Sequence, residues 1–449
     1  MSDIPLIGHS DPAQPVAYRG ARPIPAGDFV ADVVGLAERL PARSHLVNFC
    51  NDRYNFAVGF GAALLRDQIT LLPPNRTPSM LAQLQEEHGG LYALVDDASE
   101  PASIERVTIG AENPRRRVEG GVPAFPEGRI AAIAFTSGST GHPTPHRKSW
   151  GALCRGAVSE AQRFALEPGT PVTLVSTVPP QHMYGLESSL LMALRNGLAF
   201  HASRPFYPLD VRTALADVKE RRVLVTTPFH LRAMLADSFE LPPLHLIVCA
   251  TAVLSSELAA EAEALHHAPL HEVYGFTEAG MVATRRTTEG SIWHALAGVV
   301  LGRDGDSIRV RGGHVETEVP FTDVVDLLDA THFELRGRDS DLVNIAGKRT
   351  SLAYLNHQLN GIDGVQDGVF FMPEESGNVT RLVAFVVAPD LPREKLVEQL
   401  RSRVDDVFMP RPLHVVDALP RNSTGKLPRE ALEEFARALA LRSKREKAV

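Results

Sequence analysis

The chain has 449 residues and a mass of 48.8 kDa, a length that excludes a peptide hormone and predicts about two or three folding units. Hydrophobic residues make up 44% and charged residues 22% of the sequence, a globular balance that excludes disorder over most of the length. The formal charge is −8 and no long basic block interrupts the chain, so we do not expect a nucleic acid as partner.

The cysteines and histidines do not predict a metal site. Cys50, Cys154 and Cys249 are widely separated and show no paired spacing, so neither a zinc site nor a disulfide framework is expected, and a reducing cytoplasm fits best. The histidine-rich segment 266–272 also lacks a known ligand spacing, and we interpret it as a solvated loop.

The N-terminus has no basic region followed by an apolar core, which is the pattern of an export signal. The longest apolar run, Phe56–Leu65, is well short of the roughly 20 residues that span a bilayer. We therefore expect no export signal, no membrane anchor and a cytoplasmic protein.

Short β-rich runs alternate with helix-periodic stretches from Leu46 onward. This alternation predicts a large layered α/β domain built on parallel strands and reaching about residue 320. The predicted strands are 46–49, 69–72, 94–95, 130–135, 172–176, 223–226 and 246–249, and the predicted helices include 56–65 and 80–87.

The pattern changes in the last third of the chain. Short runs rich in glycine and charge between Met281 and Asp323 predict β-hairpins, including Ser307–Gly313, and the chain after Arg338 is α+β in pattern. We expect a large N-terminal domain, 1–337, with a β-hairpin subdomain, and a small mobile C-terminal domain, 338–449. The C-terminal domain is predicted to contain strands at 369–372 and 382–387 and helices at 393–404 and 429–441.

A segment rich in hydroxyl groups and glycine directly follows the apolar strand expected at 130–135. Its glycines let the backbone curl, and its hydroxyl and amide groups are donors for phosphate oxygens, so a triphosphate is the expected ligand. The Gly-Lys-Ser/Thr of a Walker loop is missing, which argues against a kinase or other P-loop ATPase, and the alternative is a surface turn. The segment consists of Thr136, Ser137, Gly138, Ser139, Thr140 and Gly141.

Together with Pro143, this segment resembles the phosphate-binding signature of the adenylate-forming superfamily, which contains acyl-CoA synthetases, nonribosomal peptide adenylation domains and firefly luciferase. Further segments resemble the superfamily's motifs in the same order along the chain, and a chance match of all of them is not plausible. These are Tyr274-Gly275-Phe276-Thr277-Glu278, then Asp323, Gly337-Arg338 and Gly347-Lys348-Arg349, and finally Pro420-Arg421-Asn422-Ser423-Thr424-Gly425-Lys426.

The resemblance implies an enzyme that joins a carboxylate to the α-phosphate of ATP, releases pyrophosphate and passes the acyl group to a thiol of coenzyme A or of a carrier-protein phosphopantetheine. The reaction of two anions requires charge neutralisation and positioning. The segment 136–141 would hold the β- and γ-phosphates, Thr277 would donate to the α-phosphate, and Glu278 would hold Mg²⁺ as a hard oxygen ligand.

The resemblance also assigns roles near the ribose and in the C-terminal domain. Asp323 is expected to accept hydrogen bonds from both ribose hydroxyls, as a carboxylate can. Arg338 would bind ribose oxygens, and Arg349 the region of the α-phosphate. Lys426, a mobile ammonium, would bridge the attacking carboxylate and the α-phosphate, and it is our first candidate for a catalytic residue.

Members of the superfamily rotate the small domain between the two half-reactions, which explains the large sequence distance between Lys426 and the phosphate segment. The hinge is expected at Asp339-Ser340-Asp341, where Ser340 replaces the usual Asp or Lys, and the sequence does not decide which of the three residues carries the rotation. Gly347 would let a pantetheine arm pass close to the backbone.

The chain departs from the superfamily directly after the loop proline, where Thr144 stands in place of a lysine. The next cations are His146, Arg147 and Lys148. Two alternatives stay open: Lys148 reaches the γ-phosphate, or no cation replaces the missing one. Adenylation is compatible with both, because the C-terminal lysine is the more central of the two family lysines.

The acid is expected beside Pro179-Pro180-Gln181-His182-Met183-Tyr184-Gly185, which resembles the superfamily's Pro-x-x-His-x-x-Gly stretch. His182 is the main candidate for this wall, with Tyr184, Phe229 and His230 beside it. Adenine would lie against the small residues Ala250, Thr251 and Ala252 and stack on Tyr274, and Gly275 is expected beside both nucleotide and acid.

The short chain and the His146-Arg147-Lys148 variant resemble the compact acyl ligases of bacterial aryl-polyene and xanthomonadin pigment clusters, which activate a hydroxybenzoate-like acid for a carrier protein. An aryl acid is therefore favoured, with a medium-chain fatty acid as the alternative. A nucleotide-binding regulator without catalysis is the competing hypothesis, and the replacements at Thr144 and Ser340 favour it.

Overall fold

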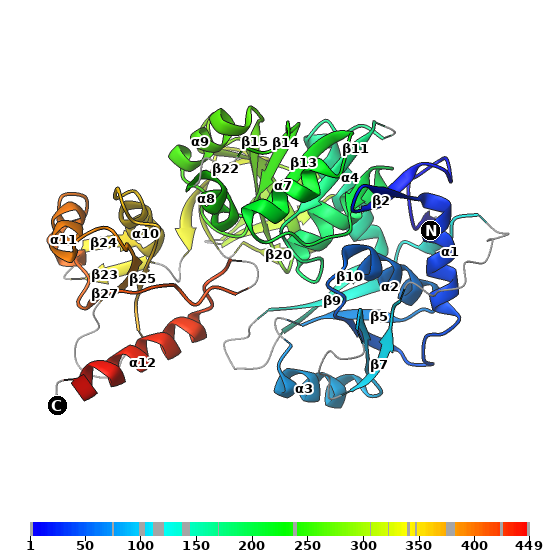
Figure 1. Cartoon of the computed structure of the whole chain (residues 1–449), viewed down its shortest axis with the longest axis horizontal. Coiled ribbons are helices and arrows are strands. Elements are labelled where there is room, and N and C mark those ends of the chain that lie inside the picture. Colours follow the sequence, from blue (N-terminus) through cyan, green and yellow to red (C-terminus); the bar gives the residue numbers. More distant parts are fainter. Residues whose placement is uncertain are drawn as a thin grey trace. The chain divides into compact units, whose positions relative to one another are not determined.

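The computed structural model describes residues 3–73, 76–97, 104–110, 121–136, 144–168, 170–236, 240–305, 307–321, 323–338, 342–345, 348–373, 382–422 and 425–446. The elements follow one another along the chain as coloured in Figure 1. Internal contacts divide the chain into two units, of which the first holds Met1–Ala250, Ser256–Phe321 and Leu327–Phe333, and the second Thr251–Ser255, Thr322–Asp326 and Glu334–Val449. The predicted fold class, α/β with a large N-terminal and a smaller C-terminal domain, is confirmed. The domain boundary at 337/338 stays a prediction.

The first unit contains a sheet with the strand order β10-β9-β5-β4-β6-β7. All neighbours are parallel except β10, which is antiparallel to β9. Helix α3 covers one face through the buried residues Leu81 and Leu84, which pack against Val47, Leu71 and Ile133 of the strands. The strands are β4 (His45–Asn48), β5 (Ile69–Leu72), β6 (Tyr92–Val95), β7 (Glu105–Thr108), β9 (Ile130–Thr136) and β10 (Thr144–Ser149), and the helices nearby are α1 (Ala26–Ala37), α2 (Arg53–Leu65) and α3 (Pro78–His88).

A larger sheet has the strand order β21-β22-β17-β16-β15-β14-β13-β11-β12-β2-β3. Strands β2, β12, β11, β13, β14 and β15 are parallel, and the continuous apolar run of β14 follows from burial on both faces. The strands are β2 (Pro15–Arg19), β3 (Arg22–Pro25), β11 (Val172–Ser176), β12 (Ala199–His201), β13 (Arg221–Thr226), β14 (Leu246–Cys249), β15 (Leu270–Phe276), β16 (Gly280–Arg285), β17 (Ile292–Ala295), β21 (Asp323–Leu327) and β22 (His332–Arg338).

Helical segments connect the parallel strands, and the carboxyl ends of these strands lie at one edge of the sheet, where ligands bind in open α/β sheets. The loops that begin there lead into α5 after β11 and into α8 after β13. The helical segments are α4 (Trp150–Arg163), α5 (Met183–Gly185), the π-helix η1 (Leu186–Leu191), α6 (Met192–Arg195), α7 (Pro208–Ala216), α8 (Pro228–Ala236) and α9 (Ser256–His266).

The predicted β-hairpins between 281 and 323 are confirmed. Strands β18 (Val299–Asp304), β19 (Ser307–Gly312) and β20 (Val315–Pro320) form an antiparallel sheet, and β1 (Asp3–Pro5) pairs with β8 (Ala124–Pro126).

The interpretation of 266–272 as a solvated loop is wrong. His266 ends α9 and is 7% exposed, while Glu272 lies in β15, is 5% exposed and accepts a hydrogen bond from Arg285 at 2.8 Å.

The second unit is α+β, as predicted. One apolar core joins α10 and α11 to β25 and β26 through residues such as Leu359, Leu396 and Phe370, and α12 packs on the opposite side, with the rings of Phe435 and Phe385 5.3 Å apart. The elements are β23 (Leu342–Ile345), β24 (Lys348–Ser351), α10 (Leu352–Asn360), β25 (Asp367–Phe371), β26 (Val383–Val387), α11 (Arg393–Arg401), the 3₁₀ turn η3 (Asp406–Phe408), β27 (Leu413–Val415) and α12 (Arg429–Glu446).

Across the described ranges of both units, no helix has the length and the apolar composition that a membrane crossing requires.

Candidate active site

The predicted phosphate segment connects two strands of a hairpin. Thr136 is the last residue of β9, and its register partner is Thr144, the first residue of β10. The Oγ1 of Thr136 is hydrogen bonded to the Nε2 of His146 at 2.9 Å. The other residues of the predicted segment, Ser137, Gly138, Ser139, Thr140 and Gly141, lie outside the described residues.

Thr277 and Glu278 form the turn between the antiparallel strands β15 and β16. The Glu278 side chain is 30% exposed, and its Oε1 lies 3.6 Å from the Nε2 of His146. From the same strand as His146, the Nζ of Lys148 donates to the backbone carbonyl of Glu278 at 2.9 Å. Two motifs far apart in sequence, the end of β9 and the Thr-Glu turn, are therefore brought together through β10.

Burial dominates the electrostatics around this turn. Burial lowers the pKa of His146, against the opposing effect of the Glu278 carboxylate. Burial also lowers the pKa of Lys148, and the charges of Glu187, Glu278 and Glu316 oppose that shift. Conversely, burial raises the pKa of Glu187 to about 7 even though Lys148 acts to lower it.

The position of Lys148 bears on whether this residue replaces the missing loop lysine on the γ-phosphate or no cation does. Its side chain is 7% exposed, and its ammonium group is bonded to the turn. Arg147, the next residue along β10, is exposed. In this structure Lys148 is thus a buried residue that is hydrogen bonded to the turn. To bind the γ-phosphate, its ammonium group would have to break the hydrogen bond to the Glu278 carbonyl.

Gly275 and Tyr274 precede the turn, and local packing explains why a glycine and an aromatic residue occupy these positions. A β-bulge lies between them, and a Cβ at Gly275 would stand 2.6 Å from the carbonyl oxygen of Gly280, so no other residue fits without displacing β16. The ring of Tyr274 stacks on Phe321 with centroids 5.2 Å apart and an interplanar angle of 7°. Adenine stacking on Tyr274 would therefore use the face turned away from Phe321.

The small residues expected beside adenine directly follow β14. Ala250 is 6% exposed, Thr251 is half-buried and Ala252 is exposed. Thr251 has φ 83°, a conformation that is rare and costly for a β-branched residue. Backbone strain of this kind concentrates at functional sites, which agrees with a ligand-facing loop.

The predicted acid wall comes from two neighbouring strand ends. His182 caps α5, and the hydroxyl of Tyr184 donates to the backbone carbonyls of Thr226 in β13 and Val248 in β14, at 3.2 and 3.0 Å. Phe229, in α8, is half-buried and lies two residues after Thr227. The structure thus brings Tyr184 to the end of β13, the strand that leads to Phe229, but it directs the Tyr184 hydroxyl into the backbone.

His230, the neighbouring candidate, is 2% exposed. Its Nδ1 is hydrogen bonded to the hydroxyl of Thr227 at 2.9 Å, and burial lowers its pKa to about 4. His230 is therefore a buried, neutral histidine at physiological pH.

The second unit presents Lys426 on an exposed turn. Asn422 closes the turn from both sides, because its side chain accepts from the Lys426 amide at 2.9 Å and its own amide donates to the Lys426 carbonyl at 2.8 Å. Asp323 begins β21, Arg338 ends β22 and Arg349 lies in β24. The expected hinge residues Asp339, Ser340 and Asp341 and the expected tunnel residue Gly347 lie outside the described residues.

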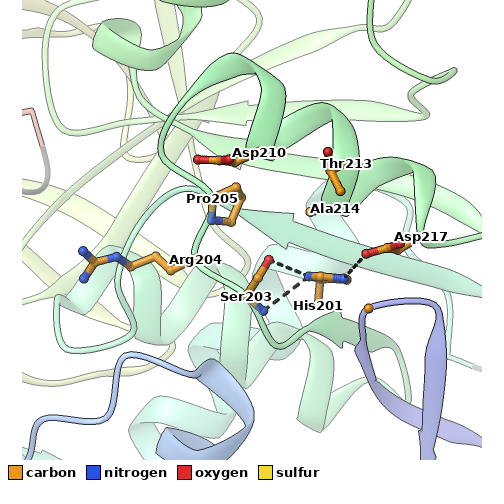
Figure 2. A pocket seen from close by; sticks show the side chains of 9 residues that line it. His201, Ser203, Arg204, Pro205, Asp210, Thr213, Ala214 and Asp217 are labelled. Atoms are coloured by element: carbon orange, nitrogen blue, oxygen red, sulfur yellow. Dashed lines mark hydrogen bonds and ion pairs between the residues drawn. The ribbon is translucent and has the colours of Figure 1, made fainter. Parts of the chain in front are cut away.

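A cavity of about 380 Å³ elsewhere in the first unit includes none of the predicted site residues (Figure 2). Within it, His201 lies between Ser203, whose Oγ is 2.7 Å from its Nδ1, and Asp217, whose Oδ2 is 3.3 Å from its Nε2. His201 ends β12 and Asp217 follows α7, so this arrangement joins the end of a strand to the end of a helix.

Comparison with protein families gives a match over most of the chain. The model of the AMP-binding enzyme family matches residues 44–320, and the model of the AMP-binding enzyme C-terminal domain matches residues 359–426. The chain belongs to the AMP-binding enzyme family. The resemblance to the adenylate-forming superfamily that the motifs indicated is thereby confirmed.

The AMP-binding enzyme is similar in sequence to two 4-coumarate–CoA ligases. The protein from Rhodobacter capsulatus is 28% identical over 299 residues, covering 66% of this chain and 74% of the relative. The protein from Halorhodospira halophila is 27% identical over 306 residues, covering 65% and 73%.

The fold of the AMP-binding enzyme also matches solved structures at lower identity. ATP-bound MatB from Rhodopseudomonas palustris has a TM-score of 0.79 and 18% identity, with 95% of this chain and 96% of that chain covered. O-succinylbenzoate coenzyme A synthetase (MenE) from Bacillus subtilis, in complex with AMP, has a TM-score of 0.78 and 18% identity, with 94% and 95% covered.

In this AMP-binding enzyme the sequence reasoning missed Glu187. It lies in η1 with 3% exposure, directly after the predicted acid wall. The signal in the sequence was an acidic residue within the otherwise apolar or small run from Leu186 to Leu194, where burial of a lone carboxylate requires a partner.

Proposed function

We propose that the chain is an ATP-dependent acid–thiol ligase. It activates a carboxylic acid as an acyl adenylate with release of pyrophosphate and transfers the acyl group to the thiol of coenzyme A or of a carrier-protein phosphopantetheine. The observation that carries the proposal is the convergence of Thr136 and the Thr277–Glu278 turn through His146, at 2.9 and 3.6 Å. Thr136 leads into the segment expected to hold the β- and γ-phosphates, and its proximity to the turn supports the proposal that the α-phosphate and Mg²⁺ bind there.

The residues at this turn suit magnesium. Mg²⁺ is usually held by one or two carboxylates together with phosphate oxygens, and the part-exposed Glu278 carboxylate would supply one such ligand. When bound, the ion would neutralise charge on the phosphates. Thr277 would donate to the α-phosphate and orient it toward the attacking carboxylate.

The remaining site residues keep the roles that the resemblance implies. Arg349 would act near the α-phosphate and Lys426 would bridge carboxylate and phosphate, in a domain that turns about Asp339 or Ser340 between half-reactions. The nucleotide is proposed to contact Ala250, Thr251, Ala252, Tyr274, Gly275, Asp323 and Arg338, the acid His182, Tyr184, Phe229 and Gly275, and the thiol arm Gly347.

An aryl acid is the proposed substrate class. The name 4-coumarate–CoA ligase describes an aryl-substituted acid as the substrate of both relatives, and o-succinylbenzoate is also an aryl acid. The acid wall of this chain carries aromatic side chains, with the rings of Phe229 and Phe206 6.2 Å apart. A hydroxybenzoate-like acid delivered to a carrier protein, as in the pigment-cluster ligases, is the specific form of this proposal.

Acid-dependent exchange of labelled pyrophosphate into ATP tests the proposal. A panel of benzoates, cinnamates and medium-chain fatty acids should give exchange with at least one aryl acid, and AMP should be the nucleotide product. A chain that binds ATP but gives no exchange with any acid would be the nucleotide-binding regulator instead. Exchange restricted to the fatty acids would reject the aryl class while leaving adenylation intact, and parallel thioester assays with coenzyme A and a holo carrier protein identify the acceptor.

A further inference from the structure

The turn that carries Thr277 and Glu278 is held from two sides by buried charged side chains. On one side, the Nζ of Lys148 donates to the Glu278 carbonyl at 2.9 Å, and this lysine is 7% exposed. On the other side, Glu187 is 3% exposed, and its carboxylate lies against the backbone of Gly280, which directly follows the turn. Each side chain comes from a different element, β10 and η1, and both contact the backbone of the turn or its immediate continuation.

The backbone of the turn fits tightly against Glu187. Gly280 has φ 81°, and a Cβ placed there would lie 2.7 Å from the Oε1 of Glu187. Gly275, on the other strand of the hairpin, leaves equally little room because a Cβ would lie 2.6 Å from the Gly280 carbonyl oxygen. The turn therefore has little space in which to shift while Glu187 stays in place.

Lys148 and Glu187 both lie in a region with little access to water. The Glu278 carbonyl accepts from Lys148, and loss of that donor would leave a part-buried acceptor without this hydrogen bond, which costs free energy. Glu187 is the second residue of the π-helix η1, directly after the predicted acid wall, and π-helical turns often mark functional sites.

We propose that Lys148 is a positioning residue that fixes the Thr277–Glu278 turn, with Glu187 packed against Gly280 at the end of the turn, and that Lys148 does not itself bind the phosphates. This inference rests on the proposed function, in which that turn contacts the α-phosphate and Mg²⁺. It gives Lys148 in β10 a role that differs from that of the superfamily's loop lysine, whose position Thr144 occupies in this chain.

Amide hydrogen exchange of the full-length protein without nucleotide tests the positioning directly. In Lys148→Met, peptides covering 276–281 should exchange at least about tenfold faster, which corresponds to about 1.4 kcal/mol, while peptides from β13 and β14 keep their wild-type rates. Glu187→Gln keeps the size of the side chain that packs against Gly280 but removes its charge, and it should produce a smaller increase in the same peptides. Lys148→Arg should restore part of the protection, and Lys219→Met, which changes an exposed lysine, is the matched control.

Binding of MgATP provides the second readout. The Mg²⁺ concentration that half-saturates nucleotide binding, followed by titration calorimetry, should rise about tenfold in Lys148→Met, with the KM for the acid within twofold of wild type.

The inference is overturned if the 276–281 peptides keep wild-type exchange in both variants, or if exchange rises evenly across the first unit, because the pair would then contribute overall stability alone. It is also overturned if Lys148→Met weakens ATP binding while the turn stays protected, which is the result expected of a direct phosphate ligand. A wild-type protein that shows the protected turn but no pyrophosphate exchange would instead contradict the proposed function.

Discussion

The guanidinium of Arg421 donates to both carboxylate oxygens of Asp367, at 2.7 and 2.6 Å. Both side chains are 16% exposed, and the same arginine also donates to the carbonyl of Gly425. A bidentate pair of this kind is strong and directional. It connects β25 to the turn that presents Lys426, so the position of the proposed catalytic lysine depends on a fixed ion pair within the second unit.

Replacing Arg421 by methionine should destabilise the second unit by about 2–4 kcal/mol, because the part-buried Asp367 carboxylate loses its partner. Hydrogen exchange of β25 and β26 measures this change. Unfolding followed by the fluorescence of Trp150 and Trp293, both in the first unit, should be unaffected. Arg401→Met, which removes an ion pair whose side chains are 61% and 81% exposed, is the control and should change little. Equal effects of the two variants would contradict a structural role for the Arg421–Asp367 pair.

Lys426→Ala should reduce adenylation on the order of 100- to 1,000-fold, the usual effect of removing one group that stabilises transition-state charge. Thioester formation from preformed acyl adenylate should remain close to the wild-type rate, because Lys426 is proposed to act in the first half-reaction alone. Single-turnover assays of the two steps measure this, with Lys395→Ala, an exposed lysine of α11, as control. Similar losses in both half-reactions would reject the rotation of the C-terminal domain.

Tyr184→Phe should lower stability and leave acid binding almost unchanged. The hydroxyl is bonded to the carbonyls of Thr226 and Val248, so its removal leaves buried acceptors and costs about 1–2 kcal/mol, measurable by urea unfolding with tryptophan fluorescence. The phenyl ring remains as part of the acid wall, and the KM for the acid should stay within twofold. Tyr207→Phe, at a residue that is 67% exposed, serves as control. A tenfold increase in that KM at unchanged stability would mean that the hydroxyl contacts the acid.

Glu160→Gln should stabilise the protein increasingly as the pH rises. Glu160 is completely buried, and its carboxyl oxygens make no hydrogen bond to a described residue. Burial raises its pKa well above the ordinary value of 4.5, and the neighbouring Ser188 hydroxyl offsets this in part. Because the folded-state pKa is the higher one, the unfolded state loses its proton first. The wild type therefore loses stability as the pH rises above about 4.5, by up to about 1.4 kcal/mol per pH unit.

Urea unfolding at pH 5, 6, 7 and 8 measures the difference between Glu160→Gln and the wild type. The gain should be smallest at pH 5 and grow toward pH 8. Glu261→Gln, an exposed position on α9, is the matched control. A gain for Glu160→Gln that is constant across this range would mean that Glu160 titrates alike in the folded and unfolded chain.

The strands of the larger sheet illustrate what the sequence can predict. Strands β11 and β14 match the predicted 172–176 and 246–249 to the residue, because a parallel strand buried on both faces is a continuous apolar run bounded by turn residues. Helix ends were less accurate: α11 ends at Arg401 where 404 was predicted, and α2 begins at Arg53 because the Asp52 side chain caps it. Strands β2 and β3, near the N-terminus, were missed because their prolines and arginines hide the alternation.

Candidate site residues can be named from the sequence where a local motif carries the chemistry, and not where packing creates the contact. Thr277 and Glu278 were named from five consecutive residues, and their roles stay predictions. The bond from Lys148 to Glu278 joins residues 130 positions apart, and no local pattern announces it. The hydroxyl of Tyr184 is a similar case, because its partners lie 42 and 64 positions away on strands whose order in the sheet the sequence does not specify.

Because Thr136 pairs with Thr144, the number of residues between them and the position of Lys148 in β10 do not depend on each other. Thr136 and Thr144 are register partners in the β9–β10 ladder, and the same ladder sets the register of Lys148 opposite Ala132. An insertion between the two threonines would keep the hydrogen bond from Lys148 to the turn. The entropic cost of closing the longer loop grows slowly, by about 0.6 kcal/mol per doubling of loop length. Homologous proteins can therefore differ in the length of this loop and still keep a cation at the position of Lys148.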